Sequence, residues 1–148
     1  MQLTNEVKTI LCKSAVAAGS SDITDATAVD TAGYEGVRFI FSFGAITGSA
    51  VTSVAAASLA TSAPTPGTDD IAGSSITVPD TADDKIFILD IYKPALRYVR
   101  PFVKRATQNA VLNSIIAELY GHSGLHPIAK DATVIAQELS VSPANGTA

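Results

Sequence analysis

Short runs of apolar and β-branched residues recur along the chain at intervals of roughly ten residues, and clusters of Gly, Pro, Asp and Ser separate them. In the clearest run, 37–43, every second position is apolar: Val37, Phe39, Phe41 and Phe43. This alternation predicts a strand whose four large side chains face the core. Because such short runs outnumber helical patterns, the sequence predicts an all-β fold, an antiparallel β-sandwich.

Glycines and prolines divide the middle of the chain. Residues 44–48 begin and end with Gly and predict a turn, so we expect 37–43 to form a hairpin with a second strand at 49–58. Residues 59–84 contain Gly, three prolines and two acidic pairs. We expect this segment to be an exposed loop with one strand at 74–78.

Two further strands follow this loop. Residues 85–92 are apolar on both faces, which is typical of a central strand between two layers or of a strand covered by a partner. The next strand, 96–104, contains Pro101, which has no backbone N–H to donate to a neighbouring strand. We therefore expect this strand at a sheet edge or at a bulge.

The segment 109–120 supports two interpretations. Its apolar residues repeat with the spacing of an amphipathic helix: Val111, Leu112, Ile115, Ile116 and Leu119. The β-branched residues among them fit a strand equally well. Taken alone, the periodicity favours the helix.

Composition limits the size and class of the protein. The chain has 148 residues, 47% of them hydrophobic, which suffices for one domain but not for two. We expect this sandwich domain to span 1–131, with a short N-terminal arm, 1–5. The composition of 132–148 is too polar to fold by itself, so we expect an extended C-terminal arm there.

Charge and hydropathy exclude several partners. Only 16% of residues are charged, below the roughly 25% of a typical soluble domain, so the surface is bland and suits contact with other protein. The net charge of -4 argues against nucleic acid as a partner. No run approaches the roughly 18 apolar residues of a membrane span, and the N-terminus lacks a secretion signal, so we expect no membrane and synthesis in a cytoplasm.

Candidates for catalysis or metal binding are few. His122 and His126 are four residues apart, but the Gly and Pro residues around them disfavour a helix, so we expect exposed loop histidines. The acidic pairs lack the spacing of a calcium loop. Cys12 lies among apolar residues and is expected to be a buried, inert thiol. Because phosphate-binding, dinucleotide-binding and nucleophile-elbow motifs are also missing, we expect no enzyme activity, no cofactor and no metal.

The charge distribution gives the most specific signal. Residues 85–105 carry six cations and the single acid Asp90, in a chain that is otherwise negative. These cations either pair with the protein's own carboxylates, each exposed pair contributing at most about 1 kcal/mol, or form an intermolecular patch. On the second interpretation the interface comprises Lys93, Arg97, Tyr98, Arg100, Lys104 and Arg105, together with Val134, Ile135 and Leu139 of the C-terminal arm.

Four segments, 30–43, 90–94, 97–100 and 109–121, resemble the head decoration (cement) proteins of tailed bacteriophages. The resemblance covers most of the chain but rests on structural signatures. It implies a jelly-roll fold in which 109–120 is a late strand, and on that ground we expect a strand there.

The same resemblance implies a function. A decoration protein is not an enzyme; it is assembled in the host bacterial cytoplasm and located on the exterior of the capsid in the virion. The implied partners are the major capsid protein and the chain itself, as a homodimer or homotrimer. One alternative is a phage tail or baseplate component. Another is a carbohydrate-binding jelly roll, which would need an exposed tyrosine as its platform because the chain has no Trp.

Overall fold

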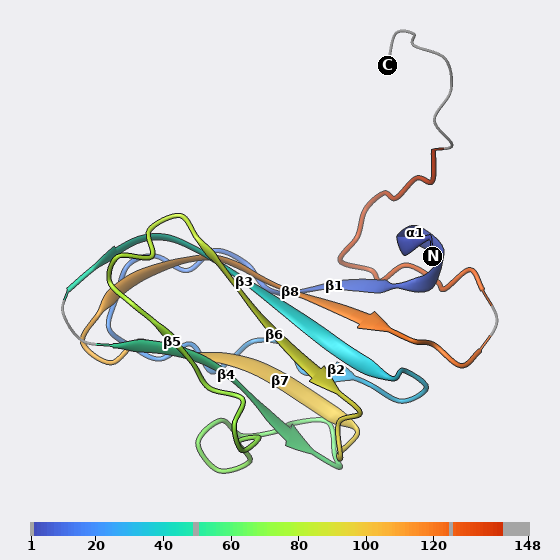
Figure 1. Ribbon diagram of the computed structural model, residues 1–148, viewed down its shortest axis with the longest axis horizontal. Coiled ribbons are helices and arrows are strands. Elements are labelled where there is room, and N and C mark those ends of the chain that lie inside the picture. The colour runs from blue at the N-terminus through green and yellow to red at the C-terminus, as the bar shows by residue number, and fades with distance from the viewer. Residues whose placement is uncertain (1, 49–50, 125, 141–148) are drawn as a thin grey trace, which may run out of the picture.

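The computed structural model describes residues 2–48, 51–124 and 126–140. In these ranges one short helix and eight strands follow one another along the chain (Figure 1). Their bounds are α1 (Leu3–Glu6), β1 (Lys8–Lys13), β2 (Val29–Asp30), β3 (Gly36–Thr47), β4 (Thr52–Leu59), β5 (Ile76–Val78), β6 (Ile86–Tyr92), β7 (Tyr98–Lys104) and β8 (Asn109–Tyr120). The predicted all-β class is therefore confirmed.

The eight strands form two four-stranded antiparallel sheets. The strand order is β1-β8-β3-β6 in one sheet and β2-β7-β4-β5 in the other. Figure 1 shows these sheets as two layers that enclose the core. The predicted antiparallel β-sandwich is therefore confirmed, and this strand order is that of a jelly roll, the fold that the resemblance implies.

The core lies between the layers and is built largely from aliphatic and Phe side chains. The four predicted core residues of β3, Val37, Phe39, Phe41 and Phe43, are almost completely buried. The alternation predicted at 37–43 is therefore confirmed.

Strand β8 settles the segment 109–120 as a strand. It pairs with β1 on one side and with β3 on the other. The register to β3 shifts between Ser114 and Leu112, so Asn113 is an extra residue, a β-bulge. Before the bulge the buried positions are even-numbered, up to Leu112, and after it they are odd-numbered, from Ile115 onward. That change explains the three-and-four spacing that imitates a helix in the sequence.

The predicted hairpin after Phe43 is wrong. Strand β3 continues through 44–47, and β4 lies in the opposite sheet. The chain therefore crosses between the layers here instead of turning back in one sheet. Gly48, with φ of 111°, is at the end of β3, and residues 49–50 lie outside the described ranges.

The positions expected for the next two strands also change. Strand β6, expected as a central strand between two layers or as a strand covered by a partner, is an edge strand beside β3. Strand β7, expected at a sheet edge or at a bulge, is an inner strand between β2 and β4, and its register to β4 has no shift. Its Pro101 is nevertheless tolerated, because β2 pairs only with Tyr98 and Val99 and the next bridge on that side joins Ile23 to Val103. Pro101 falls in the gap between these contacts, where no N–H is required.

The N-terminal residues lie beside the loop that follows β8. The N-terminal residues, expected as an extended arm, form the single helical turn α1 instead. The loop after β8 contacts this turn, since Ile128 N donates to Asn5 O at 2.9 Å. Residues 129–140 contain neither strand nor helix and extend away from the sandwich beside α1 and β1 (Figure 1).

The helix α1 is the only helix in the described ranges, and its four residues are far too few to cross a membrane.

Candidate interaction surface

The predicted interface begins at Arg97, just before β7. Its Nε and Nη2 donate hydrogen bonds to the two carboxylate oxygens of Asp30 at 2.8 and 2.6 Å. This bidentate bond lowers the pKa of the Asp30 carboxyl and raises that of the guanidinium. The guanidinium also lies 5.1 Å from the ring centroid of Tyr98. Arg97 is therefore an exposed cation whose charge is balanced within its own chain.

Arg105 has a structural role. The residue is 5% exposed. Its guanidinium donates to the backbone oxygens of Ser21 at 2.6 Å, Ala17 at 2.8 Å and Ala110 at 2.9 Å. These bonds fasten the 17–22 loop to β8. Arg105 is therefore removed from the candidate interface, because a buried side chain that satisfies its own chain cannot reach a partner.

The remaining residues of β7 alternate between the core and the outer face of its sheet. Tyr98, Arg100 and Lys104 point outward and are at least partly exposed. Lys104 Nζ lies 3.6 Å from an oxygen of Asp70. The Nε of Arg100 is buried without a hydrogen-bond partner among the described residues. Part of the predicted patch therefore does share one strand face.

Lys93 lies apart from that face, in the turn after β6. Its backbone is left-handed, with φ of 49°, and its N–H donates to Glu35 O at 2.7 Å. The ammonium lies 5.1 Å from the ring centroid of Tyr92. No carboxylate in the described ranges forms a salt bridge with Lys93, so its charge is available to a partner.

The predicted arm residues follow the loop after β8. Thr133 Oγ1 accepts a hydrogen bond from Leu11 N at 3.0 Å, and Lys130 Nζ donates to Val134 O at 2.8 Å. Beyond this anchor the side chains are exposed: Ile135 by 88% and Leu139 by 44%. The structure thus places two apolar side chains in solvent on a segment without regular structure.

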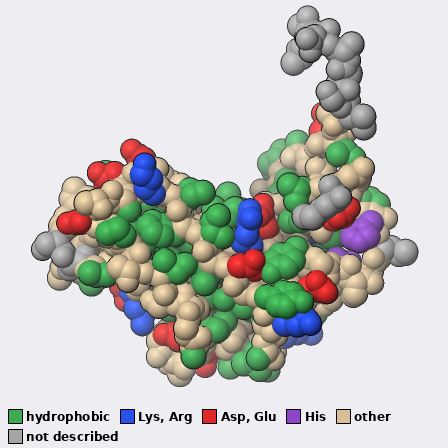
Figure 2. Space-filling model, in the orientation of Figure 1, with side chains coloured by type: hydrophobic (Ala, Val, Ile, Leu, Met, Phe, Trp, Pro, Cys, Tyr) green, Lys and Arg blue, Asp and Glu red, His purple; other side chains and the backbone are tan. Residues whose placement is uncertain are grey.

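A feature that the sequence analysis missed lies on the outer face of the other sheet. Register pairs join one aliphatic residue from each strand into a row across it: Leu11, Ile116, Ile40 and Ile88. In the view of Figure 2, hydrophobic side chains gather over the middle of the molecule, where Figure 1 draws β6. The signal in the sequence was the second apolar face of 85–92. A central strand between two layers would bury that face, whereas the edge strand β6 exposes it.

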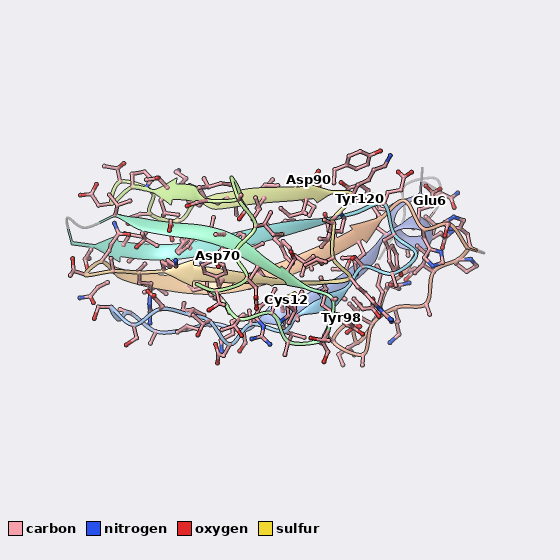
Figure 3. All side chains as sticks on the ribbon, turned by 90° about the horizontal axis from the view of Figure 1, so that it is seen from below. Glu6, Cys12, Asp70, Asp90, Tyr98 and Tyr120 are labelled. Atoms are coloured by element: carbon pink, nitrogen blue, oxygen red, sulfur yellow. The ribbon has the colours of Figure 1, made fainter. Side chains whose placement is uncertain are left out.

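A polar row lies beside this aliphatic row. Arg38 Nη2 and Glu118 Oε2 are 2.8 Å apart, and Tyr120 Oη donates to Asp90 at 2.6 Å. Figure 3 shows Asp90 and Tyr120 together at the end of their strands. Partial burial and this bond raise the pKa of Tyr120. The four side chains line a pocket of about 310 Å³ together with Leu3 and Val7.

The candidate chemical groups form no reactive centre in the described ranges. Cys12 is buried, and desolvation raises the pKa of its thiol to about 12, so the nucleophilic thiolate is disfavoured. The rings of His122 and His126 lie 6.3 Å apart, and His126 Nδ1 is 3.1 Å from Asn5 O. Among the described residues no three His, Cys, Asp or Glu side chains gather to hold a metal ion.

Comparisons with known proteins add little to this description. No family model matches the chain, and no curated protein sequence matches it. A solved structure with a similar fold comes from Bacillus endospore appendages, described as a novel family of disulfide-linked pili. The two chains are 10% identical, the match covers 81% of this chain and 90% of that one, and the TM-score is 0.48. A likeness at this level carries no inference about function.

Proposed function

We propose that this chain is a structural virion protein that decorates the outside of an icosahedral phage head. There it binds the major capsid protein and stabilises the contacts between capsid subunits. The proposal rests first on the resemblance of segments 30–43, 90–94, 97–100 and 109–121 to head decoration proteins, and the jelly roll is the fold that this resemblance implies.

The structural observation that carries the proposal is the C-terminal arm. Ile135 and Leu139 are exposed on this segment without regular structure, and an assembly protein can bury both side chains against a neighbour. Binding to the assembled shell but not to free subunits would stabilise the shell by mass action.

Exposed cations supply the second part of the contact. Lys93 directly follows β6 and Lys104 ends β7, and of the two only Lys104 has a carboxylate nearby, that of Asp70 at 3.6 Å. Such cations fit an acidic area on the shell, where they accelerate encounter and fix orientation more than they add affinity. Arg97 contributes less, because Asp30 already balances its charge.

The test is rebinding of the purified protein to heads from which it has been stripped. We expect the double variant Lys93→Glu/Lys104→Glu to cosediment less with heads than the wild type, and the loss to shrink with added salt. Lys13→Glu/Arg38→Glu makes the same charge change outside 85–105 and the C-terminal arm, at cations of β1 and β3 that pair with Asp25 and Glu118, and serves as the matched control. Wild-type protein that does not bind stripped heads at low salt contradicts the proposal.

Two other functions remain as alternatives. A tail or baseplate component would have the same fold and arm, and its location in the virion distinguishes it. A carbohydrate-binding module would use Tyr92, the most exposed of the four tyrosines at 59%, which lies beside the Asp90 and Tyr120 pair. Binding of the wild type, but not of Tyr92→Ala, to a glycan array would favour that module.

A further inference from the structure

The edge of the sheet at β6 is open. Phe43 N donates a hydrogen bond to Lys85 O, and Lys93 N donates to Glu35 O. The backbone groups of the odd-numbered residues around β6 therefore face β3. By alternation, the backbone groups of the even-numbered residues 86–92 point away from the sheet. Their side chains lie on its outer face, and Ile86 and Tyr92 are each 59% exposed.

This edge lacks the features that usually prevent strand addition. The register to β3 runs without a shift from Tyr92 to Ile86, so β6 has no bulge, and it contains no proline. Its one charged residue, Asp90, accepts the hydrogen bond from Tyr120, which holds the carboxylate over the sheet.

The other edges in the described ranges are short or occupied. Strands β2 and β5 have two and three residues. Strand β1 has a register shift, and its outer side bonds to the chain's own segments, through Leu11 N to Thr133 and Cys12 O from Thr27 N. A strand from outside therefore has its best acceptor at β6.

The C-terminal arm has the properties of the added strand. Residues 134–140 have no regular structure, and Ile135 and Leu139 share one face at the period of a strand, since they are four residues apart. Seven residues match the seven residues of β6 in length. On the acceptor, the aliphatic row across the sheet ends at Ile88 on the open edge, so a fifth strand that carries Ile135 or Leu139 would continue it.

The donor and the acceptor lie on opposite edges of one sheet. The arm is anchored by Thr133 at β1, and β6 is three strand spacings away, about 14 Å. Reaching its own β6 would draw the arm across the outer face of its own sheet, whereas the edge of a neighbouring copy can meet it directly.

We propose that residues 134–140 of one copy add as a strand to β6 of a second copy. The main-chain bonds supply affinity, and Ile135 and Leu139 bury themselves beside Ile86 and Ile88. Because donor and acceptor are different surfaces, the contact is head-to-tail, which gives a ring if the rotation between copies closes and a filament if it does not. This self-assembly deepens the proposed function. The inference rests on that function only for the location of the oligomer on a shell.

The test compares oligomer mass by sedimentation velocity for the full-length protein. We expect the wild type to form a concentration-dependent oligomer, and both Ile88→Lys and Ile135→Asp/Leu139→Asp to weaken its association at least about 10-fold. Val51→Lys introduces the same charge at an exposed apolar residue just before β4 of the opposite sheet, and it should assemble like the wild type. Thermal unfolding of each variant confirms that the sandwich is retained.

Mixing the two defective variants gives the decisive result. The Ile88→Lys protein keeps an intact arm, and the Ile135→Asp/Leu139→Asp protein keeps an intact edge. A head-to-tail contact predicts that their mixture forms a dimer, and only a dimer. A monomeric wild type at the highest concentration tested, or a folded Ile88→Lys protein that assembles normally, overturns the inference. Both measurements use protein without heads, so either failure leaves the proposed binding to the shell to be judged by its own test.

Discussion

Arg97 and Asp30 join the two-residue strand β2 to the start of β7 through two parallel hydrogen bonds, and Thr31 reinforces the junction by donating from its N–H and its hydroxyl to Arg97 O. The cation that the sequence offers as an anchor for a partner thus also holds an edge of its own sheet. Both side chains are roughly half exposed, so the pair contributes at most about 1 kcal/mol to stability.

The pair predicts a pH dependence of stability. The pKa of Asp30 is lower in the folded chain than in the unfolded chain, so the folded state binds fewer protons as pH falls. The contribution is complete above the unfolded value of about 4 and is lost as pH falls through the folded pKa. In urea unfolding, the free energy of unfolding should fall less between pH 6 and pH 2 for Asp30→Asn than for the wild type. An identical loss in both proteins would mean that the pair does not stabilise the fold.

Arg105 predicts a large loss of stability on substitution. In Arg105→Met the oxygens of Ala17, Ser21 and Ala110 lose their donors, and we expect a destabilisation of about 3 kcal/mol. Arg105→Lys should recover little, because one ammonium cannot reproduce the planar fork.

The neighbouring residue provides the control for Arg105. Lys104→Met removes one exposed cation that lies 3.6 Å from Asp70, and it should change the free energy of unfolding by less than about 1 kcal/mol. Equal effects of the two substitutions in denaturant unfolding would contradict the structural role of Arg105.

Tyr120 should titrate above the ordinary range of a tyrosine. Its pKa is raised by partial burial and by the bond to Asp90, so the phenol stays protonated when ordinary tyrosines ionise near pH 10. Because the folded pKa exceeds the unfolded one, the stabilisation is present below pH 10 and is lost as pH rises through the folded pKa. A pH titration followed by absorbance near 295 nm should show a component above pH 10 in the wild type that is lost in Tyr120→Phe, and a wild type without such a component would contradict the raised pKa.

At Gly36, next to Tyr120, the structure leaves no room for a larger side chain. It pairs with Tyr92 on one side and with Tyr120 on the other, and a Cβ there would overlap the Tyr120 hydroxyl and lie 3.0 Å from Ile91 O. We expect Gly36→Ala to cost about 1–3 kcal/mol in denaturant unfolding. A neutral substitution would mean that the Tyr120 ring moves aside freely.

A strand could be predicted from the sequence wherever apolar and polar side chains alternate within that strand alone. Phe39, Phe41 and Phe43 mark β3 because each needs only its own strand to define a face. The position of a strand within a sheet depends on partners far along the chain, so the apolar pattern of β6 could not distinguish a central strand from an open edge. The bulge at Asn113 similarly disguised β8.

The candidate interface was less predictable than the fold. Charge counting located six cations in 85–105 but could not show that Arg105 turns inward or that Asp30 is close enough to bind Arg97. Arg97 and Asp30 are 67 positions apart, and Arg105 binds Ser21 and Ala17 across 84 and 88 positions. The exposed side chains of the arm, Ile135 and Leu139, were recognisable because a polar tail with few apolar residues has no core of its own to fold into.

The most direct test of the central claim is a cryo-EM map of the virion whose genome encodes this chain. The account predicts density for the jelly roll on the outer surface of the head, above the junctions between major capsid subunits. The 132–140 arm should be visible against a neighbouring subunit. Density for this chain confined to the tail or baseplate, or a head surface that lacks it, would contradict the account.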